Sequence, residues 1–266
     1  MSGIYNSLRI TGVAKTITDV MGIGAPKKAE QSIDIIRSSA GAVFNSRKAD
    51  RVFIYNPDAI ALWLFQKYTY LFEKAFLCSD IQIPLLSVMP SVTPVCFASM
   101  YTGAMPGVHG IQSYEKPTLE TDTVFDAFIR AGMKPVIVSI TDASVSRIFL
   151  NRDMDYFIYD STEECNKKAM ELIVEDKHNL IVLYNGNYDY IMHRNGTESD
   201  KSLNELKNNI ETYNIIIRQI ERYWNSHRTM IGFCPDHGCH DIDGNLGSHG
   251  LDMAEDMNVI HFYKFI

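Results

Sequence analysis

The chain has 266 residues, 46% of them hydrophobic and 21% charged, which is enough for one large α/β domain or two small ones. Its formal net charge of −7 at pH 7 argues against a general nucleic-acid-binding protein, because such proteins need an excess of Lys and Arg. The charge does not exclude phosphate chemistry, since bound metal ions can dominate the local charge of a site.

The five cysteines are an odd number and lack the spacing of a disulfide framework, which favours a reducing compartment. No signal-peptide-like stretch opens the chain, and no run of about 18 apolar residues is present that could cross a bilayer. We therefore expect a cytoplasmic protein without a membrane partner.

Residues 1–50 predict two helices and carry no visible chemistry. Apolar residues recur at roughly helical spacing from Ile4 to Met21, and a break follows at Gly22 to Pro26. A second amphipathic segment runs from Ile33 to Phe44. We expect both helices to pack on the outside of a sheet; the alternatives are a lid over a site or an arm that joins two copies into a homo-oligomer.

From residue 51 onward, short apolar strands alternate with helical segments, and residues 51–266 contain no linker or repeat. This alternation predicts βαβ units in one α/β domain, with a largely parallel central sheet and helices on both faces. The strand at Met230 is expected to close the series. The predicted strands are Val52–Tyr55, Pro84–Val88, Pro135–Ile140, Tyr156–Tyr159, Leu180–Tyr184 and Met230–Phe233, and the predicted helices are Ala59–Phe76, one from about Thr93, Phe125–Ala131, Glu163–Val174 and Lys201–Trp224.

The densest group of polar side chains follows the last of these strands. Asp236, His237, His240 and His249 fall within a glycine-rich stretch of the sequence. An open α/β sheet binds its ligands at the carboxyl ends of its strands, and mixed nitrogen and oxygen donors suit zinc or a similar divalent metal. One stretch cannot saturate a pair of metal ions, so a metal pair would need further ligands from earlier strand ends.

Two earlier strands are followed by candidate ligands. Asp58 comes after the first strand, although a lone Asp before a helix is more often an N-cap. Asp189 and His193 follow the strand Leu180–Tyr184 and are four residues apart, so on a helix they share one face and could bind one metal. Each signal is weak alone.

Thr93 is the candidate nucleophile. It stands before Pro94 at the expected start of a helix, where proline is favoured. The simple alternative is that Thr93 only caps the helix. The functional interpretation places its hydroxyl at a positive helix N-terminus that can hold a phosphoryl oxygen, where a metal would lower its pKa.

Together these residues resemble the alkaline phosphatase superfamily, most closely its type I phosphodiesterase/nucleotide pyrophosphatase branch. Six motifs occur in the order of that branch over about residues 51–262. Six motifs in order are far more specific than any single motif. They are Asp58, Pro90–Thr93 with Thr102-Gly103, Pro106–Gly110, Asp189–His193, Asp236–Gly238 and Gly247–Gly250. The resemblance implies an alkaline phosphatase-like fold without a large cap domain, and a hydrolase that acts on phosphoric esters.

The resemblance also implies a site with two divalent metal ions, with zinc favoured and manganese as the alternative. Thr93 would attack phosphorus and form a phosphothreonine intermediate, and the substrate would be a phosphodiester or a nucleotide pyrophosphate. One metal would be held by Asp189, His193 and His249, and the other by Asp58, Asp236, His237 and the Thr93 oxygen.

The chain departs from the branch near the nucleophile. The branch usually has an Asn about three residues after the threonine, whereas Cys96 stands there, and a thiol is a poor hydrogen-bond donor. We expect the substrate surface to include Cys96, Tyr188, Tyr190 and Arg194, the last three stacking on or hydrogen-bonding a base or sugar. His109 and His240 match no ligand and are expected to be structural.

The sequence favours diesters over monoesters. Enzymes for monoester dianions usually place an Arg or Lys against the extra oxygen, and neither occurs between Leu85 and Glu115. Alternatives remain: a phosphomonoesterase or phosphomutase of the same superfamily, a catalytically degenerate metal-binding member, or a non-catalytic protein with a structural zinc at Cys234, Cys239 and His240. No nucleic-acid duplex is expected as a partner.

Overall fold

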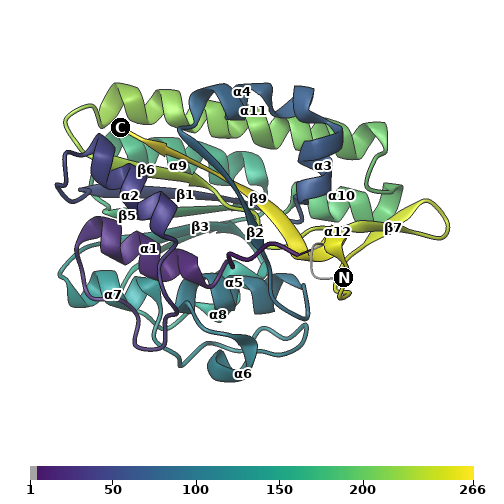
Figure 1. Ribbon diagram of the computed structural model, residues 1–266, viewed down its shortest axis with the longest axis horizontal. Coiled ribbons are helices and arrows are strands. Elements are labelled where there is room, and N and C mark those ends of the chain that lie inside the picture. The colour runs from purple at the N-terminus through teal and green to yellow at the C-terminus, as the bar shows by residue number, and fades with distance from the viewer. Residues whose placement is uncertain (1–4) are drawn as a thin grey trace.

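The middle layer of the protein is a seven-stranded sheet, seen in a computed structural model that describes residues 5–266 (Figure 1). The strand order is β2-β9-β6-β1-β5-β3-β4, and β9 alone runs antiparallel to its neighbours. The prediction of a largely parallel central sheet is thereby confirmed. The strands are β1 Arg51–Pro57, β2 Ile81–Leu86, β3 Pro135–Ile140, β4 Asp155–Tyr159, β5 Leu180–Asn185, β6 Thr229–Phe233 and β9 Asn258–Phe265.

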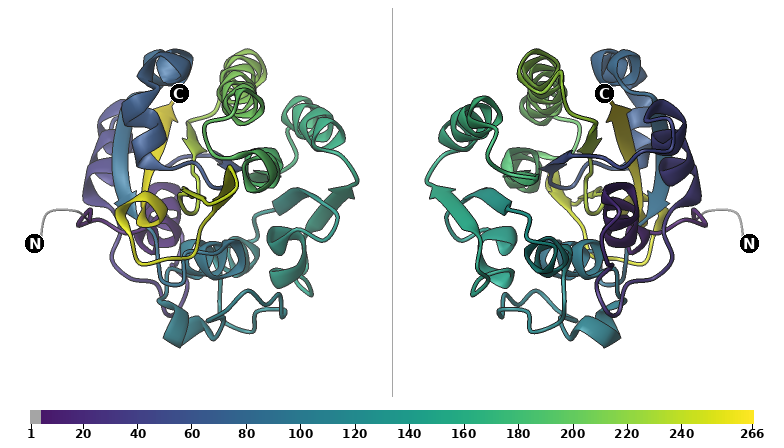
Figure 2. Two further views of the ribbon diagram at one scale, coloured as in Figure 1. Left: turned by 90° about the vertical axis from the view of Figure 1, so that its right-hand side faces the viewer. Right: turned by 90° about the vertical axis from the view of Figure 1, so that its left-hand side faces the viewer.

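Helices cover both faces of this sheet (Figure 2). The two faces of β1 are equally buried, since Val52 and Ile54 face one hydrophobic cluster while Phe53 and Tyr55 face the other, as expected for a central parallel strand. The first cluster includes side chains of α1 Gly12–Met21, α2 Asp34–Val43, α5 Thr93–Thr102, α7 Val124–Arg130 and α8 Ser144–Ile148; the second includes α3 Leu62–Lys67, η1 Thr69–Phe72, α4 Glu73–Cys78, α9 Thr162–Glu175, α10 Asn187–Asn195 and α11 Asp200–Tyr223.

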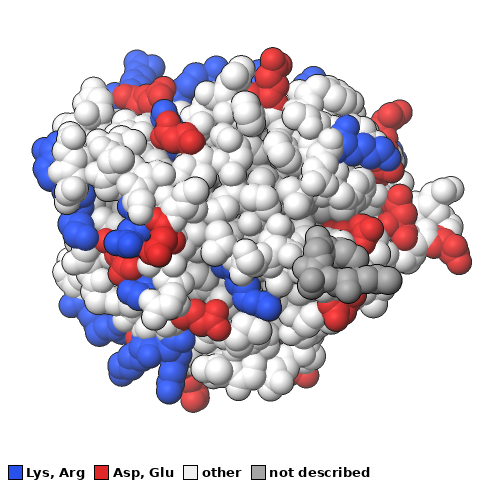
Figure 3. Space-filling model, viewed as in Figure 1, with Lys and Arg blue, Asp and Glu red and all other residues white. Residues whose placement is uncertain are grey.

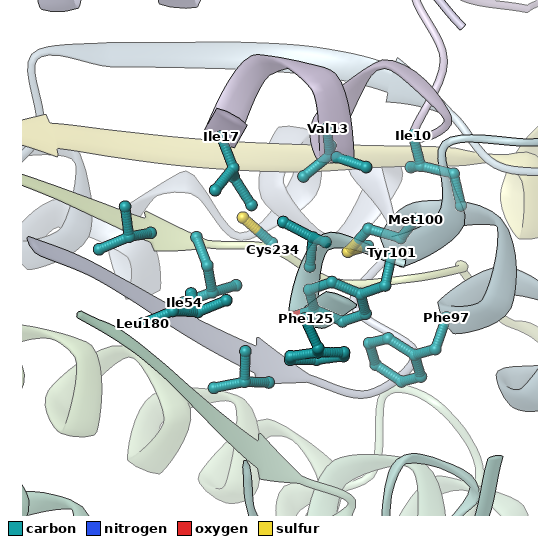
Figure 4. Packing of buried hydrophobic residues seen from close by; sticks show 14 of the residues in the cluster. Ile10, Val13, Ile17, Ile54, Phe97, Met100, Tyr101, Phe125, Leu180 and Cys234 are labelled. Carbon is teal, nitrogen blue, oxygen red and sulfur yellow. The ribbon is translucent and has the colours of Figure 1, made fainter. Parts of the chain in front are cut away.

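The described part of the N-terminal segment belongs to the first of these clusters. Val13 and Ile17 of α1 point towards Ile54 and Met100 (Figure 4), and α1 lies against α5 and α7. Ile4, one of the apolar positions in the predicted pattern, lies outside the described residues. The roles of residues 1–50 as a lid or an oligomer arm stay predictions.

Two segments differ from the sequence-based expectation. The single helix predicted over 59–76 is divided into α3, η1 and α4; the Thr69 hydroxyl donates to the carbonyl oxygen of Phe65 (2.8 Å), a bond that competes with the backbone ladder. The strand at Met230 does not close the series, because β9 follows it after the hairpin β7 His240–Ile242 and β8 Leu246–Ser248. Two short helices, α6 Pro106–His109 and α12 Ala254–Met257, complete the fold.

Candidate metal centre and nucleophile

The candidate ligands follow three neighbouring strands. Asp58 comes directly after β1, Asp189 lies in α10 just after β5, and Asp236 follows β6. These strands are adjacent in the order β6-β1-β5 and parallel, so their carboxyl ends meet at one edge of the sheet. The three candidate ligands therefore lie at the carboxyl ends of parallel strands, where the strand patterns of the sequence predicted them.

Asp58, Asp236 and His237 form a fully buried cluster, here called the inner group. The Nε2 atom of His237 lies 3.3 Å from Oδ1 of Asp58 and 3.4 Å from Oδ2 of Asp236. One donor atom from each residue lies within 4.8 Å of the others, which is a separation that one metal ion can bridge.

Asp189, His193 and His249 form a second cluster, the outer group, whose members are partly exposed. Oδ1 of Asp189 lies 3.2 Å from Nε2 of His193 and 3.3 Å from Nε2 of His249. The rings of His237 and His249 stack at a centroid distance of 4.1 Å, so the two groups adjoin. Among the described residues, these are the two clusters of His, Cys, Asp and Glu side chains with metal-binding geometry.

The three imidazoles are held in one tautomer by the backbone. Nδ1 of His193, His237 and His249 lies 2.9–3.0 Å from the carbonyl oxygens of Gly247, Gly238 and Ser91 respectively. Because a carbonyl only accepts, each Nδ1 carries the proton and each Nε2 offers its lone pair to the cluster. Metal-binding histidines are typically oriented by such a bond.

Three carboxylate oxygens in these clusters are buried without a hydrogen-bond partner: Oδ1 of Asp58, Oδ1 of Asp189 and Oδ2 of Asp236. Each faces an imidazole Nε2 at 3.2–3.4 Å, so lone pairs point at lone pairs. Such an arrangement requires a proton or a cation between the atoms. The mixed oxygen and nitrogen donors fit a divalent metal such as zinc.

Burial dominates the electrostatics of the inner group. It raises the pKa of Asp58 to about 7, assisted by the negative charge of Asp189, and raises the pKa of Asp236 well above its usual range, assisted by Asp58. Burial, with the positive charge of His249, lowers the pKa of His237 to about 3. All three shifts disfavour the charged forms, as expected in a low-dielectric site without a counterion.

The outer group compensates its own charge. Burial opposes ionisation of Asp189, but its interactions with His193 and His249 outweigh burial and hold the pKa of that carboxyl below its usual range. The bond with Asp189 raises the pKa of His193, and it also raises the pKa of His249 against the effect of burial. In the metal-free protein, a proton on Nε2 of His193 or His249 would fill the gap to Asp189 Oδ1 and make this group an ion pair.

Thr93 is buried at the first residue of α5, and its hydroxyl faces the inner group. Oγ1 lies 3.4 Å from Oδ2 of Asp58 and 3.3 Å from Nε2 of His237. The N-cap of α5 is Val92, and no side chain caps this helix. The alternative that Thr93 only caps the helix is therefore wrong.

Two predicted substrate contacts are wrong because the side chains are buried. Sγ of Cys96 lies 3.1 Å from the hydroxyl of Ser87, which itself donates to the carbonyl oxygen of Asp236. Tyr188 faces the second hydrophobic cluster, and its hydroxyl donates to the carbonyl oxygen of Thr197. Both residues support the site from behind and neither is open to a substrate.

Tyr190 and Arg194 lie on the exposed side of α10, next to two outer-group ligands. The Arg194 guanidinium carbon is 3.6 Å from the centre of the Tyr190 ring, and Nη1 donates to the carbonyl oxygen of Tyr190. Tyr190 is 59% exposed. The pair forms a flat cationic and aromatic platform beside the outer group.

His109 and His240 lie outside both metal-binding clusters and make hydrogen bonds within the protein. Nε2 of His109 lies 2.8 Å from the hydroxyl of Ser99, and Nδ1 of His240 lies 2.7 Å from Asp256. The alternative of a structural zinc site is not supported, since Cys234, Cys239 and His240 belong to neither cluster found among residues 5–266.

Sequence reasoning assigned no role to two tyrosines of this region. The Tyr184 hydroxyl donates to Oδ2 of Asp58 at 2.5 Å. The phenol pKa of Tyr114 is raised by burial and then by the charges of Asp58, Asp189 and Asp236, so Tyr114 lies within electrostatic range of both groups. The Lys116 ammonium lies 5.4 Å from the centre of the Tyr114 ring. No sequence pattern singled out either tyrosine.

Comparisons with known proteins agree with this description. The family model for type I phosphodiesterase/nucleotide pyrophosphatase matches residues 64–148, a region that contains Thr93 but none of the carboxylate ligands. The comparison with curated proteins gave no match. None of the helices described between residues 5 and 266 is long and apolar enough to cross a bilayer.

Solved structures of ectonucleotide pyrophosphatase/phosphodiesterase 5 share the fold. An inactive murine form in complex with AMP has a TM-score of 0.65 at 14% identity, covering 81% of this chain and 88% of that chain. The human protein has a TM-score of 0.64 at 13% identity, covering 80% and 87%. The family model and the shared fold confirm the resemblance of the chain to the type I phosphodiesterase/nucleotide pyrophosphatases, which are hydrolases of phosphoric ester bonds.

Proposed function

We propose that the protein is a metal-dependent phosphohydrolase that cleaves a phosphodiester or a nucleotide pyrophosphate bond through a phosphothreonine intermediate. The observation that carries the proposal is the position of the Thr93 hydroxyl, which lies at the start of α5 within 3.4 Å of two inner-group ligands. A hydroxyl between a helix N-terminus and buried metal ligands has the surroundings of an activated nucleophile.

The inner group would hold one metal ion together with the Thr93 oxygen, and the outer group would hold a second. The unpartnered carboxylate oxygens and the preset Nε2 atoms support this assignment, and the three imidazoles favour zinc, with manganese as the alternative. When bound, the ions would neutralise phosphoryl charge and lower the pKa of the threonine hydroxyl.

The chain's own residues would then carry the covalent step. Thr93 Oγ1 forms a new bond to phosphorus while the bond to the leaving group breaks, and the proton lost by Thr93 ends on the leaving-group oxygen. Water then cleaves the phosphothreonine: its oxygen bonds to phosphorus as the bond to Thr93 Oγ1 breaks, one of its protons restores the Thr93 hydroxyl, and the phosphate product is released. Backbone N–H groups at the start of α5 would bind the phosphoryl oxygens.

We propose diesters or nucleotide pyrophosphates as the substrate class. The Tyr190–Arg194 platform offers stacking and a positive charge to a base or sugar. The murine relative was solved with AMP, in an inactive form with a threonine replaced by alanine, which is consistent with a nucleotide ligand and a threonine nucleophile. On the face seen in Figure 3, Lys and Arg are interspersed with Asp and Glu around the rim, unlike the continuous basic surface of a nucleic-acid-binding protein.

The test combines metal analysis with a substrate panel. The purified protein should contain about two divalent ions per chain, and kcat/KM should be higher for bis(p-nitrophenyl) phosphate and a nucleotide p-nitrophenyl ester than for p-nitrophenyl phosphate. A protein that binds no divalent metal would contradict the mechanism. A clear preference for the monoester would contradict the substrate class and favour the monoesterase alternative.

A further inference from the structure

Tyr184 connects the sheet to the inner group. It is the penultimate residue of β5, its side chain is buried, and its ring packs edge-on against Phe97 of α5 at a centroid distance of 5.7 Å. Its hydroxyl donates to Oδ2 of Asp58 at 2.5 Å. A hydrogen bond to a carboxylate is among the stronger ones in proteins.

Gly186 leaves room for this phenol. A Cβ atom at Gly186 would lie 2.7 Å from the Tyr184 hydroxyl and 3.2 Å from two of its ring atoms. The backbone of Gly186, with φ −97° and ψ 7°, is accessible to other residues. The glycine is therefore needed for space and not for its conformation.

The bond fixes the two oxygens of Asp58 in different roles. Oδ2 accepts from Tyr184 and, at 3.4 Å, from Thr93. Oδ1 accepts no hydrogen bond and lies 3.3 Å from Nε2 of His237. Without the phenol, the Asp58 carboxylate could rotate and present either oxygen to His237. The orientation of Oδ1 therefore depends on Tyr184.

We propose that Tyr184 is a positioning residue for the inner metal site: it holds Asp58 so that Oδ1 faces His237 and Asp236, and Gly186 keeps the space that the phenol occupies. The inference rests on the proposed function, because it assumes that the inner group binds a metal. Loss of such an orienting partner typically costs 10–100-fold in metal affinity. Among the described residues, the Tyr184 hydroxyl bonds to Asp58 and to no outer-group side chain, so the outer group should not be affected.

Zinc affinity can be measured separately at each site by chelator competition on metal-free protein. His249→Ala removes an outer-group ligand and keeps all three inner-group ligands, while Asp236→Ala does the reverse. In the His249→Ala protein, Tyr184→Phe should weaken zinc binding 10–100-fold. In the Asp236→Ala protein, the same change should leave zinc affinity within about twofold, which a general loss of stability would not do.

Two further variants complete the test. Gly186→Ala keeps the hydroxyl but displaces the ring, so it should reproduce the inner-site loss even if Tyr184→Phe folds poorly. Tyr263→Phe is the control, since the hydroxyl of this buried tyrosine contacts Cys234 and His261 but no ligand, and it should change neither site.

Equal zinc affinity of Tyr184→Phe and its parent at the inner site would overturn this inference alone. A parent protein that binds no zinc would overturn the proposed function as well.

Discussion

The inner and outer groups use similar residues in opposite electrostatic states. In the fully buried inner group, the pKa of both carboxyls is raised and that of His237 is lowered, so every member favours its neutral form. In the partly exposed outer group, Asp189 is held ionised by His193 and His249. Burial without a counterion disfavours the charged carboxylates of the inner group, which a cation would relieve, whereas protonated imidazoles can compensate Asp189 in the outer group.

The largest effect expected from this difference concerns Thr93, whose hydroxyl faces the inner group. Thr93→Ala should lower kcat by at least about three orders of magnitude, because only the nucleophile is removed, and Thr93→Ser should retain partial activity. Metal content should stay near that of the parent. The matched control is Thr102→Ala, which removes a hydroxyl at the other end of α5. Wild-type turnover of Thr93→Ala would show that Thr93 is not the nucleophile.

Metal content should fall when either group is broken. Replacing Asp236 or His249 by Ala removes a ligand from the inner or outer group respectively, so each variant should lose metal and activity, and the double variant should lose both ions. Elemental analysis of the purified variants measures this. Full metal occupancy of the double variant would contradict the assignment of the ligands.

The sign of the stability change should differ between the groups in the metal-free protein. Asp236→Asn removes a buried carboxyl that disfavours its charged form, so at pH 8 it should raise the free energy of unfolding by about 1–3 kcal/mol. Asp189→Asn breaks the ion pair with His193 and His249 and should lower it by a similar amount. Chemical denaturation after chelation measures both, and changes of equal sign would remove the distinction between the groups.

The metal-free protein should lose stability between pH 6.5 and pH 8. A carboxyl with a raised pKa stabilises the fold at low pH and loses that contribution as the pH rises through its folded-state pKa, which is about 7 for Asp58; burial and the charge of Asp58 raise the pKa of Asp236 as well. His237, whose pKa is lowered, affects stability only below about pH 6.5. The melting temperature after chelation should therefore fall over this range, and excess zinc should abolish the trend.

The smallest expected effect concerns the exposed platform. Tyr190→Ala should raise KM for a nucleotide ester several-fold, corresponding to about 1 kcal/mol of lost stacking, and should leave kcat with bis(p-nitrophenyl) phosphate nearly unchanged. Tyr70→Ala, at a similarly exposed tyrosine on another helix, is the control. An unchanged KM for the nucleotide ester would exclude the platform from substrate binding.

The sequence predicted which candidate ligands lie together better than it predicted their surroundings. Asp58, Asp189 and Asp236 could be located because the strand-end rule depends only on local strand patterns. The contact between Tyr184 and Asp58 depends on β5 lying beside β1 with Tyr184 opposite Asn56, a register that no local pattern specifies.

Other errors were avoidable from periodicity and composition. Tyr188 and Met192 are four residues apart on α10 and both face the core, so their helical spacing indicates a buried Tyr188 and not the predicted substrate contact. The stretch Asn258–Phe265 is rich in β-branched and aromatic residues, which is the composition of a strand. The prediction that the strand at Met230 is the last one was wrong on this point. The burial of Cys96 has no comparable signal, because a cysteine in an apolar helix can face either side.

The hydrogen bond from His249 to the carbonyl oxygen of Ser91 joins positions 158 residues apart. Thr93 likewise meets His237 across 144 residues, so the two groups and the nucleophile exist only after chain segments distant in sequence have come together. Contacts of such long range form slowly, because loop-closure entropy must be overcome first. During refolding, high-affinity metal binding should therefore appear with the complete sheet and not with any isolated fragment, which makes a bound metal a reporter of finished folding.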